Sequence, residues 1–263
     1  MKICVLVKEV PDAAVEKRMD PGTGRLDRSG EKNLNPFDTH AIEAAMQVRE
    51  GGVDVDEIVA VTMGPESAFR ALHKAVSLGA DRSVHLTDEA LSGSDVCATG
   101  YALARVLESE SPDLVLLGQQ SDDGECYTIG AVVADHLKML SLTQVIKIDV
   151  EGGKLRCERQ AEYGYDTVEV ELPAVISVGD AINEPRYPSL KAIMGAKKKQ
   201  LDTKSAGDVG IEPDRVGEQG SRTSVLGVNP PAEKDAGEII EDEDTNETVE
   251  KIVSWLEERK LLA

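Results

Sequence analysis

Over its first 200 residues the chain alternates short apolar runs with segments of helical periodicity. This alternation limits the folds that the chain can adopt. The apolar runs cover residues 3–7, 58–63, 83–86 and 114–117. The first and last of them are continuously apolar, as expected for strands of a parallel sheet whose two faces are both covered. Such strands, separated by helices, predict an α/β fold.

The helical segments between these runs have recognisable ends. Asn35 and Pro36 are suited to the N-cap and first position of one helix. Pro65 opens a second helix that Gly79 stops, and Ser94 can cap a third. The order of strands and helices predicts a doubly wound, mostly parallel sheet of the Rossmann-like type.

After residue 140 the pattern changes to consecutive strands. Residues 145–150, 155–158 and 167–172 have strand character, and Gly152-Gly153 is typical of a hairpin turn between the first two. Residues 173–178 form a further apolar run. We therefore expect a β-hairpin region added to the parallel sheet.

The last sixty residues are different in composition. Residues 205–246 are rich in Gly, Pro, Asp and Glu, which predicts an extended acidic arm after an α/β domain of residues 1–204. Residues 247–263 place Val249, Ile252, Val253 and Leu256 on one helix face. This terminal helix must dock on its own domain or on a partner, and the sequence leaves both open.

The charge balance excludes some partners. The chain has 29 Lys and Arg against 49 Asp and Glu, a formal net charge of -20, which argues against binding nucleic acid or anionic lipid. No apolar run reaches the roughly 18 residues that span a bilayer. The four Cys and four His show no metal-ligand or disulfide spacing. We expect a cytoplasmic protein without membrane insertion, a metal site or a catalytic constellation.

Two polar loops could hold a ligand. Residues 117–130 follow a strand and contain three glycines, but they match neither GxGxxG nor a P-loop. An anion or nucleotide site and a plain connection both remain open. Because the negative charges of Asp122 and Asp123 repel a phosphate, any phosphate contact should come from N–H groups near residues 126–129. Residues 33–38 precede a helix and are either part of the same site or simple capping.

A third segment is unusual in its charge. Residues 186–204 carry six basic residues and one acidic residue, Asp202, in a strongly acidic chain. Two prolines stiffen the preceding stretch, and Leu190 stands among polar neighbours. Residues 182–199 are predicted to be a partner-recognition loop, with a solvated basic face as the alternative.

The residues of this segment resemble a known family. The stretch 183–194, NEPRYPSLKAIM, and the lysines that follow are similar to the β subunit of electron transfer flavoprotein, as are residues 5–8, 35–37 and 116–118. That β subunit pairs with an α subunit that holds most of the FAD, and it binds a structural AMP. The resemblance implies an electron-carrier subunit rather than an enzyme. In that family the heterodimer takes electrons from acyl-CoA or related dehydrogenases and gives them to a quinone reductase or another acceptor, and the resemblance implies the same partners here.

The resemblance also implies site residues. Cofactor contacts carried over by position are Leu6, Asn35, Pro36, Phe37, Asp38, Met63, Gly118, Gln119, Gln120, Ser121, Asp122, Asp123, Gly124, Glu125, Cys126, Tyr127, Thr128 and Ile129. Partner-recognition residues are Arg186, Tyr187, Leu190, Lys197, Lys198 and Lys199, with Leu190 as the apolar anchor.

Residues 117–130, here called the nucleotide loop, leave one alternative for the cofactor that this subunit binds. Asp123-Gly124 resembles electron-bifurcating members, which hold a second FAD in this subunit in place of AMP and oxidise NADH. Those members continue with Asp-Thr-Ala-Gln, whereas residues 125–128 here read Glu-Cys-Tyr-Thr, and Tyr127 is larger than the usual residue. The resemblance therefore favours AMP over a second FAD.

Overall fold

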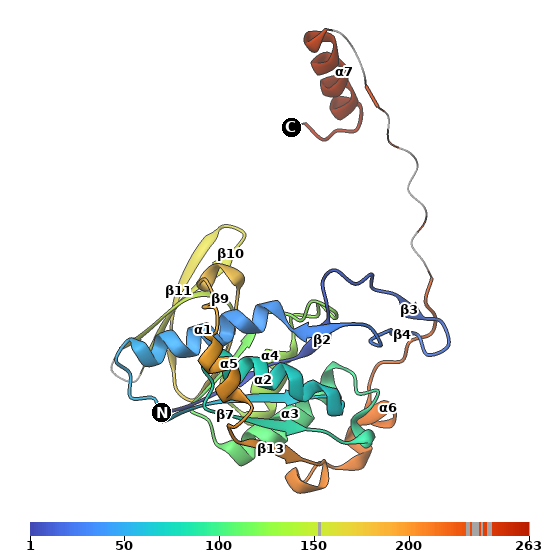
Figure 1. Cartoon of the computed structure of the whole chain (residues 1–263). Helices are drawn as coiled ribbons and strands as arrows, with labels where there is room; N and C mark the ends of the chain where they lie inside the picture. Colours follow the sequence, from blue (N-terminus) through green and yellow to red (C-terminus); the bar gives the residue numbers. More distant parts are fainter. Residues whose placement is uncertain (152–153, 230–231, 233–236, 238, 241–243, 263) are drawn as a thin grey trace. The chain divides into compact units, whose positions relative to one another are not determined.

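The apolar runs form the centre of one large sheet in the computed structural model (Figure 1). Among the residues that the structure describes, 1–151, 154–229, 232, 237, 239–240 and 244–262, nine strands join this sheet in the order β11-β10-β9-β12-β8-β1-β6-β7-β13. Neighbours pair in parallel except β9 with β10 and β10 with β11. The bounds are β1 (Lys2–Leu6), β6 (Glu57–Met63), β7 (Arg82–Leu86), β8 (Leu114–Gly118), β9 (Leu140–Glu151), β10 (Lys154–Ala161), β11 (Gly164–Glu171), β12 (Ala174–Val178) and β13 (Leu201–Lys204). The prediction of a doubly wound, mostly parallel α/β fold is confirmed.

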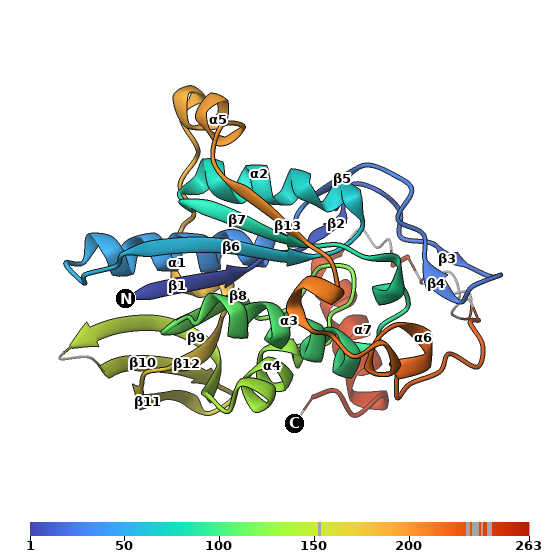
Figure 2. The same cartoon turned by 90° about the horizontal axis from the view of Figure 1, so that it is seen from below.

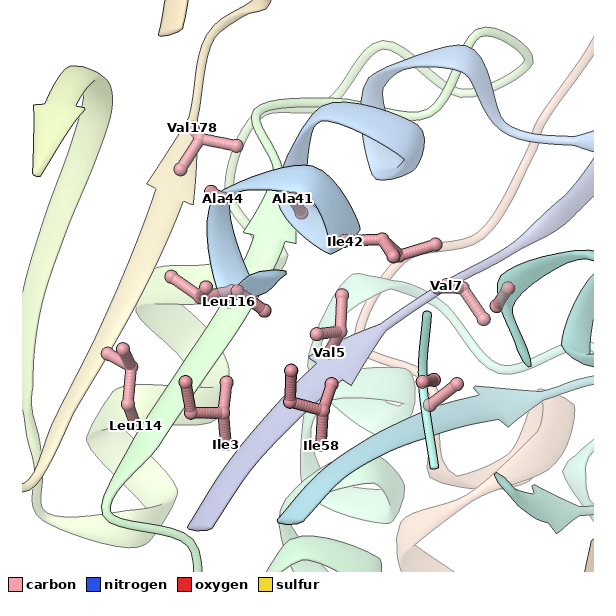
Figure 3. Packing of buried hydrophobic residues seen from close by; sticks show 14 of the residues in the cluster. Ile3, Val5, Val7, Ala41, Ile42, Ala44, Ile58, Leu114, Leu116 and Val178 are labelled. Carbon is pink, nitrogen blue, oxygen red and sulfur yellow. The ribbon is translucent and has the colours of Figure 1, made fainter. Parts of the chain in front are cut away.

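Helices cover both faces of the sheet. On one face lie α1 (Pro36–Glu50) and α2 (Phe69–Leu78), and on the other α3 (Val96–Glu110) and α4 (Ile129–Leu137) (Figure 2). Small aliphatic side chains fill the space between the layers, which suits a chain with only 3% aromatic residues. Figure 3 shows this packing under α1, with Ala41, Ile42 and Ala44 over Ile3, Val5, Leu114 and Leu116.

The helix ends follow the sequence with two exceptions. Pro65 precedes a single 3₁₀ turn, η1 (Glu66–Ala68), and α2 begins only at Phe69. Asn35 is the N-cap of α1 with Pro36 behind it, and Gly79 ends α2 at a φ of 141° that favours glycine. The expectation that Ser94 caps α3 is wrong. Asp95 is the cap, and its Oδ1 accepts from Ala98 N at 2.9 Å.

The added hairpin region is present as strands β9, β10 and β11 at one edge of the sheet. Its strands are longer than the sequence indicated. The expected turn at Gly152-Gly153 lies outside the described residues.

An excursion after β1 was not expected from the sequence. It begins and ends with the antiparallel pair β2 (Glu9–Pro11) and β5 (Lys32–Leu34), and between them β3 (Met19–Asp20) pairs with β4 (Arg25–Leu26). These strands are too short and too polar to give a periodic signal.

The compact unit extends beyond the expected boundary at residue 204. Strand β13 joins the edge of the sheet beside β7. After it come the short helices η4 (Gly207–Val209), η5 (Pro213–Arg215) and α6 (Gly217–Gly220). Val209, Ile211 and Val216 are buried in the core on the α3 side. The acidic arm therefore does not start at residue 205, because the first unit runs from Met1 to Leu226.

The second unit, Gly227–Ala263, contains α7 (Thr245–Glu258), whose cap Asp244 accepts from Asn246 N at 2.8 Å. Its apolar side chains Val249, Ile252 and Trp255 are exposed. None of the helices in the described part of the chain has the length and apolar character needed to cross a membrane.

Candidate functional site

The strand order creates a switch point between β1 and β8. From β1 the chain extends the sheet through β6 and β7 on one side, and β8 and β12 extend it on the other. In open α/β sheets, ligands bind at the carboxyl ends of the strands at such a point. A cavity of about 360 Å³ lies there. Its lining residues are Leu6, Val7, Lys8, Asn35, Asp38, Met63, Ser94, Asp95, Val96, Thr99, Leu103, Leu117, Gly118, Gln119, Gln120, Ser121, Gly124, Cys126, Tyr127, Thr128, Ile129 and Gly130.

Most of the expected cofactor contacts line this cavity. Those that do not are Pro36, Phe37, Asp122, Asp123 and Glu125. Sequence reasoning missed Val7 and Lys8, the two residues after β1. It also missed the lining residues on α3 and just before it, which are Ser94, Asp95, Val96, Thr99 and Leu103. The rule that ligands gather at strand carboxyl ends could have found Lys8. Nothing local to residues 94–99 marks them as part of the site.

Asn35 joins the two expected loops. Its Nδ2 donates to Gln120 O at 2.8 Å, and its Oδ1 accepts from Asp122 N at 3.0 Å. Its side chain makes no cap hydrogen bond to α1. Asn35 therefore holds the loop after β8 against the start of α1, and simple capping does not describe it.

Gly118 allows α1 to approach the end of β8. A Cβ at this position would lie 2.6 Å from Phe37 Cβ and 2.7 Å from the Phe37 backbone carbon. The resemblance had placed Phe37 among the cofactor contacts. In the structure it is instead the neighbour that requires a glycine at residue 118.

Asp38 is buried at the inner wall of the cavity. Its Oδ2 accepts from Lys8 N at 2.8 Å, and its Oδ1 accepts from Asn35 Nδ2 at 2.9 Å. Desolvation raises the pKa of Asp38 to about 7, although these hydrogen bonds oppose the change. At neutral pH the carboxyl group is thus partly protonated, which weakens its repulsion of an anionic ligand.

The two aspartates of the loop are neutralised by ion pairs. Asp123 has a fully buried side chain that contacts Lys8 Nζ at 2.8 Å and Arg28 Nη2 at 2.7 Å. Desolvation raises the pKa of Asp123, but Lys8 and Arg28 outweigh it and lower the value to about 2. Asp122 pairs with Lys17 Nζ at 2.9 Å. The expected repulsion of a phosphate by these aspartates is therefore largely cancelled, and two of the cations come from the excursion after β1.

The backbone changes hand where the loop enters α4, and the first residues of this helix line the cavity. Glu125 and Tyr127 have φ angles of 44° and 54°, in the left-handed region, and Thr128 follows in the right-handed region. Neighbouring residues of opposite hand form an anion-binding concavity of N–H groups. Thr128 caps α4 without a side-chain hydrogen bond, and the first helical bond runs from Val132 N to Thr128 O. The N–H groups at the start of α4 thus lack helical partners.

One buried acceptor at the cavity has no hydrogen-bond partner within the described chain. It is Gln120 Oε1, on a residue that lines the cavity. A buried acceptor normally has a partner, so a donor on a ligand is one physical explanation for it. Among the described residues, no group of three or more His, Cys, Asp or Glu side chains is placed to hold a metal ion.

The expected recognition loop projects apolar side chains into solvent. It contains α5 (Leu190–Ala196), which is capped by Ser189 and packs beside α2. Leu190 is 74% exposed and Met194 66%, and Tyr187 before the helix is 95% exposed. Lys197 and Lys198 are exposed at the end of the helix.

Two of the expected recognition residues hold the loop in place instead. Arg186 Nε contacts Glu43 Oε2 at 2.6 Å, and Arg186 Nη1 contacts Glu50 Oε1 at 2.7 Å, both on α1. Lys199 Nζ donates to Ala80 O at 2.8 Å. These bonds hold both ends of α5, and among the predicted recognition residues Tyr187, Leu190, Lys197 and Lys198 are exposed without such a side-chain contact to the described part of the chain.

The chain is similar to known proteins over its whole length. Residues 23–209 match the family model of the electron transfer flavoprotein domain. The chain is 41% identical to the electron transfer flavoprotein subunit beta of Mycobacterium tuberculosis, over 99% of both chains. It is 37% identical to the protein of that name from Thermoanaerobacterium thermosaccharolyticum, over the full length of both. It is 36% identical to a subunit of the caffeyl-CoA reductase-Etf complex of Acetobacterium woodii, again over both full lengths.

Proposed function

This chain belongs to the electron transfer flavoprotein family, and from that premise we propose that it is the β subunit of a heterodimeric electron carrier. The heterodimer takes electrons from acyl-CoA-type dehydrogenases and delivers them to a quinone reductase or another acceptor. This subunit binds a structural AMP in the cavity between β1 and β8. It works in the cytoplasm, a reducing compartment that fits the four unpaired cysteines.

The observation that carries the AMP assignment is the built cavity at the switch point. Its lining includes apolar side chains, Leu6, Met63 and Leu103, which suit the faces of an adenine ring. The start of α4 also lines the cavity and offers N–H groups to a phosphate, and the aspartates of the loop are neutralised. Its volume is near the lower limit of about 300 Å³ for small-molecule sites, which favours a mononucleotide over a dinucleotide.

The redox chemistry comes from FAD, which the α subunit holds for the most part. Asn35 and Asp123 of this chain hold the nucleotide loop in place. It also presents α5 to the dehydrogenase, with Leu190 as the apolar anchor and Lys197 and Lys198 as charges beside it. Because these lysines are exposed, raising the salt concentration weakens dehydrogenase docking.

A second candidate is the bifurcating form with a second FAD in this cavity. The Asp123-Gly124 pair and the likeness to the caffeyl-CoA reductase-Etf subunit favour it. Tyr127 opposes it, because this large side chain lines the cavity in a left-handed backbone conformation. We therefore rank AMP first.

The test is the electron donor of the purified α/β heterodimer. Flavin absorbance is followed anaerobically with an acyl-CoA and its dehydrogenase, and separately with NADH alone. The carrier function predicts rapid bleaching with the acyl-CoA system and none with NADH. Rapid direct reduction by NADH would favour the bifurcating form, and a flavin that no acyl-CoA dehydrogenase reduces would contradict the proposed donor class.

A further inference from the structure

The residues at the start of α3 line the cavity and also bind a segment near residue 220 that is distant in the sequence. Ser94 and Asp95, at the start of α3, both line the cavity. Ser94 Oγ accepts from Gly217 N at 2.8 Å, and Asp95 N donates to Ser221 Oγ at 2.8 Å. Two neighbouring residues of the cavity wall thus bind the segment that ends the first unit.

The carboxylate of Asp95 is shared between the helix and this segment. One oxygen, Oδ1, caps α3 through Ala98 N. The other, Oδ2, accepts from Arg222 N at 2.7 Å, Thr223 N at 3.0 Å and Thr223 Oγ1 at 3.1 Å. Helix capping alone needs only the first of these contacts. The second oxygen is committed to residues 222 and 223.

Two further contacts hold residues 217–223 against segments that lie outside the cavity lining. Gly217 has a φ of 67°, and a Cβ there would lie 2.6 Å from Ala90 O, so the backbone approach requires glycine. Glu218 pairs with Arg25 Nη2 at 2.5 Å, on the excursion that also supplies Arg28 and Lys17 to the nucleotide loop. Ion pairs therefore connect the excursion both to the loop of residues 118–129 and to residues 217–223.

We propose that residues 217–223, here named the latch, close against Ser94 and Asp95 in a manner coupled to nucleotide in the cavity. This inference rests on the proposed AMP site. In the closed state four donors surround the Asp95 carboxylate and offset its charge. In an open state that charge stands at the cavity wall with fewer donors and repels a phosphate. AMP therefore binds the closed state more tightly, and a difference in affinity is what a ligand needs to shift an equilibrium.

The latch lies next to the boundary between the two units of the chain. Thr223 lies just before Leu226, where the first unit ends and residues 227–263 begin. Closing the latch fixes the last part of the first unit before that second unit. By reciprocity, whatever stabilises the closed latch also tightens AMP binding by the same factor.

The experiment is hydrogen exchange of the α/β heterodimer, measured after depletion of nucleotide and again with AMP or adenosine added. AMP is expected to slow exchange of the Arg222 and Thr223 amides roughly tenfold, within the usual range of coupling. Adenosine lacks the phosphate and is expected to have a clearly smaller effect. The turn at Ser205, held by Asp208 Oδ2 at 2.8 Å, lies on the same C-terminal stretch and serves as an internal control that does not respond.

Two variants separate coupling from structure. In Asp95→Asn the amide oxygen can still cap α3, but an NH2 group replaces the oxygen that accepts from Arg222 and Thr223, so the latch should exchange fast with AMP and with adenosine alike. In Thr223→Val one donor to Asp95 is lost, and AMP affinity should fall about threefold to tenfold. Asp208→Asn is the matched control and should leave AMP affinity unchanged.

The outcomes are distinct. Bound AMP with unchanged exchange at residues 222–223 would overturn the latch and leave the proposed function intact. Equal protection by AMP and adenosine in the unmodified heterodimer would also overturn it, because the phosphate would have no special effect. A heterodimer that takes up no AMP would refute the AMP site and the latch together.

Discussion

At the scale of single residues, Asp123 shows how an acidic loop can accept an anion. Its carboxylate is withdrawn from the cavity and paired with Lys8 and Arg28. Burial without these partners would be unfavourable, because an unpaired charge in the interior is costly. The same ion pairs tie together the end of β1, the excursion after it and the nucleotide loop.

The Asp123→Asn substitution tests this role. Because the folded pKa of Asp123, about 2, lies below its unfolded value, the group stabilises the fold above pH 4. That contribution, about 2 kcal/mol, is lost as the pH falls from about 4 toward 2. At pH 7 we expect the Tm of the heterodimer to fall by roughly 4 to 8 °C. The difference from the unmodified protein should shrink below pH 4.

Asp122→Asn is the matched control for that experiment. Asp122 pairs with Lys17 near the surface, where an ion pair contributes less than about 1 kcal/mol. Its effect on Tm should be the smaller of the two at pH 7. Equal shifts for the two variants would show that the buried pairs of Asp123 have no special role.

Gly118→Ala tests the close approach of α1 to β8. The added methyl group would overlap Phe37, and overpacking of this kind costs about 1–3 kcal/mol. Released AMP per heterodimer should also fall, because residues 118–121 line the cavity. Gly195→Ala is the control, since a Cβ there meets nothing within 4 Å inside α5. An unchanged Tm in Gly118→Ala would contradict the packing argument.

At the scale of elements, α5 is held at both ends so that its outer face is free. Arg186 fixes the entry through Glu43 and Glu50, and Lys199 fixes the exit through Ala80. The helix is short and presents Leu190 and Met194 to solvent. A rigid element with an exposed apolar anchor loses little entropy when a partner binds.

Leu190→Ala should therefore weaken electron acceptance without affecting cofactors. We expect kcat/KM for reduction by the dehydrogenase to fall roughly tenfold or more, as for an interface anchor, with FAD and AMP content unchanged. Tyr163→Ala is the control, because Tyr163 is exposed beside β11, at the edge of the sheet opposite β13. A dehydrogenase-coupled rate equal to that of the unmodified protein would rule out the anchor role.

At the scale of the whole molecule, the chain has two compact units, Met1–Leu226 and Gly227–Ala263, and the second contains α7. Val249, Ile252 and Trp255 of α7 are exposed, and an exposed apolar helix face marks an interaction site. The partner that the proposed function supplies is the α subunit.

Removing residues 245–263 tests that assignment. We expect the truncated chain to fold and to keep its AMP cavity, but to co-purify with the α subunit in much lower yield. The unmodified chain, expressed beside it, is the reference. Normal recovery of the heterodimer from the truncated chain would show that α7 does not contribute to assembly.

The sequence predicted the central sheet well because its strands carry a strong and uninterrupted apolar signal. It did not predict the excursion after β1 or the packing of residues 205–226. There, short polar strands and scattered side chains such as Ile211 depend on distant neighbours. The cavity was found through residues 118–129, but Asp95 was not, because its role arises only when residues 222 and 223 fold back onto α3.

In the proposed function this subunit holds AMP and the heterodimer carries a single FAD. The most direct test is to denature the co-expressed α/β heterodimer and quantify the flavin and adenine nucleotide released per dimer. We expect one FAD and one AMP. Two FAD with no AMP would refute the AMP assignment and establish the bifurcating form, and one FAD with no AMP would show that the switch-point cavity does not retain a nucleotide.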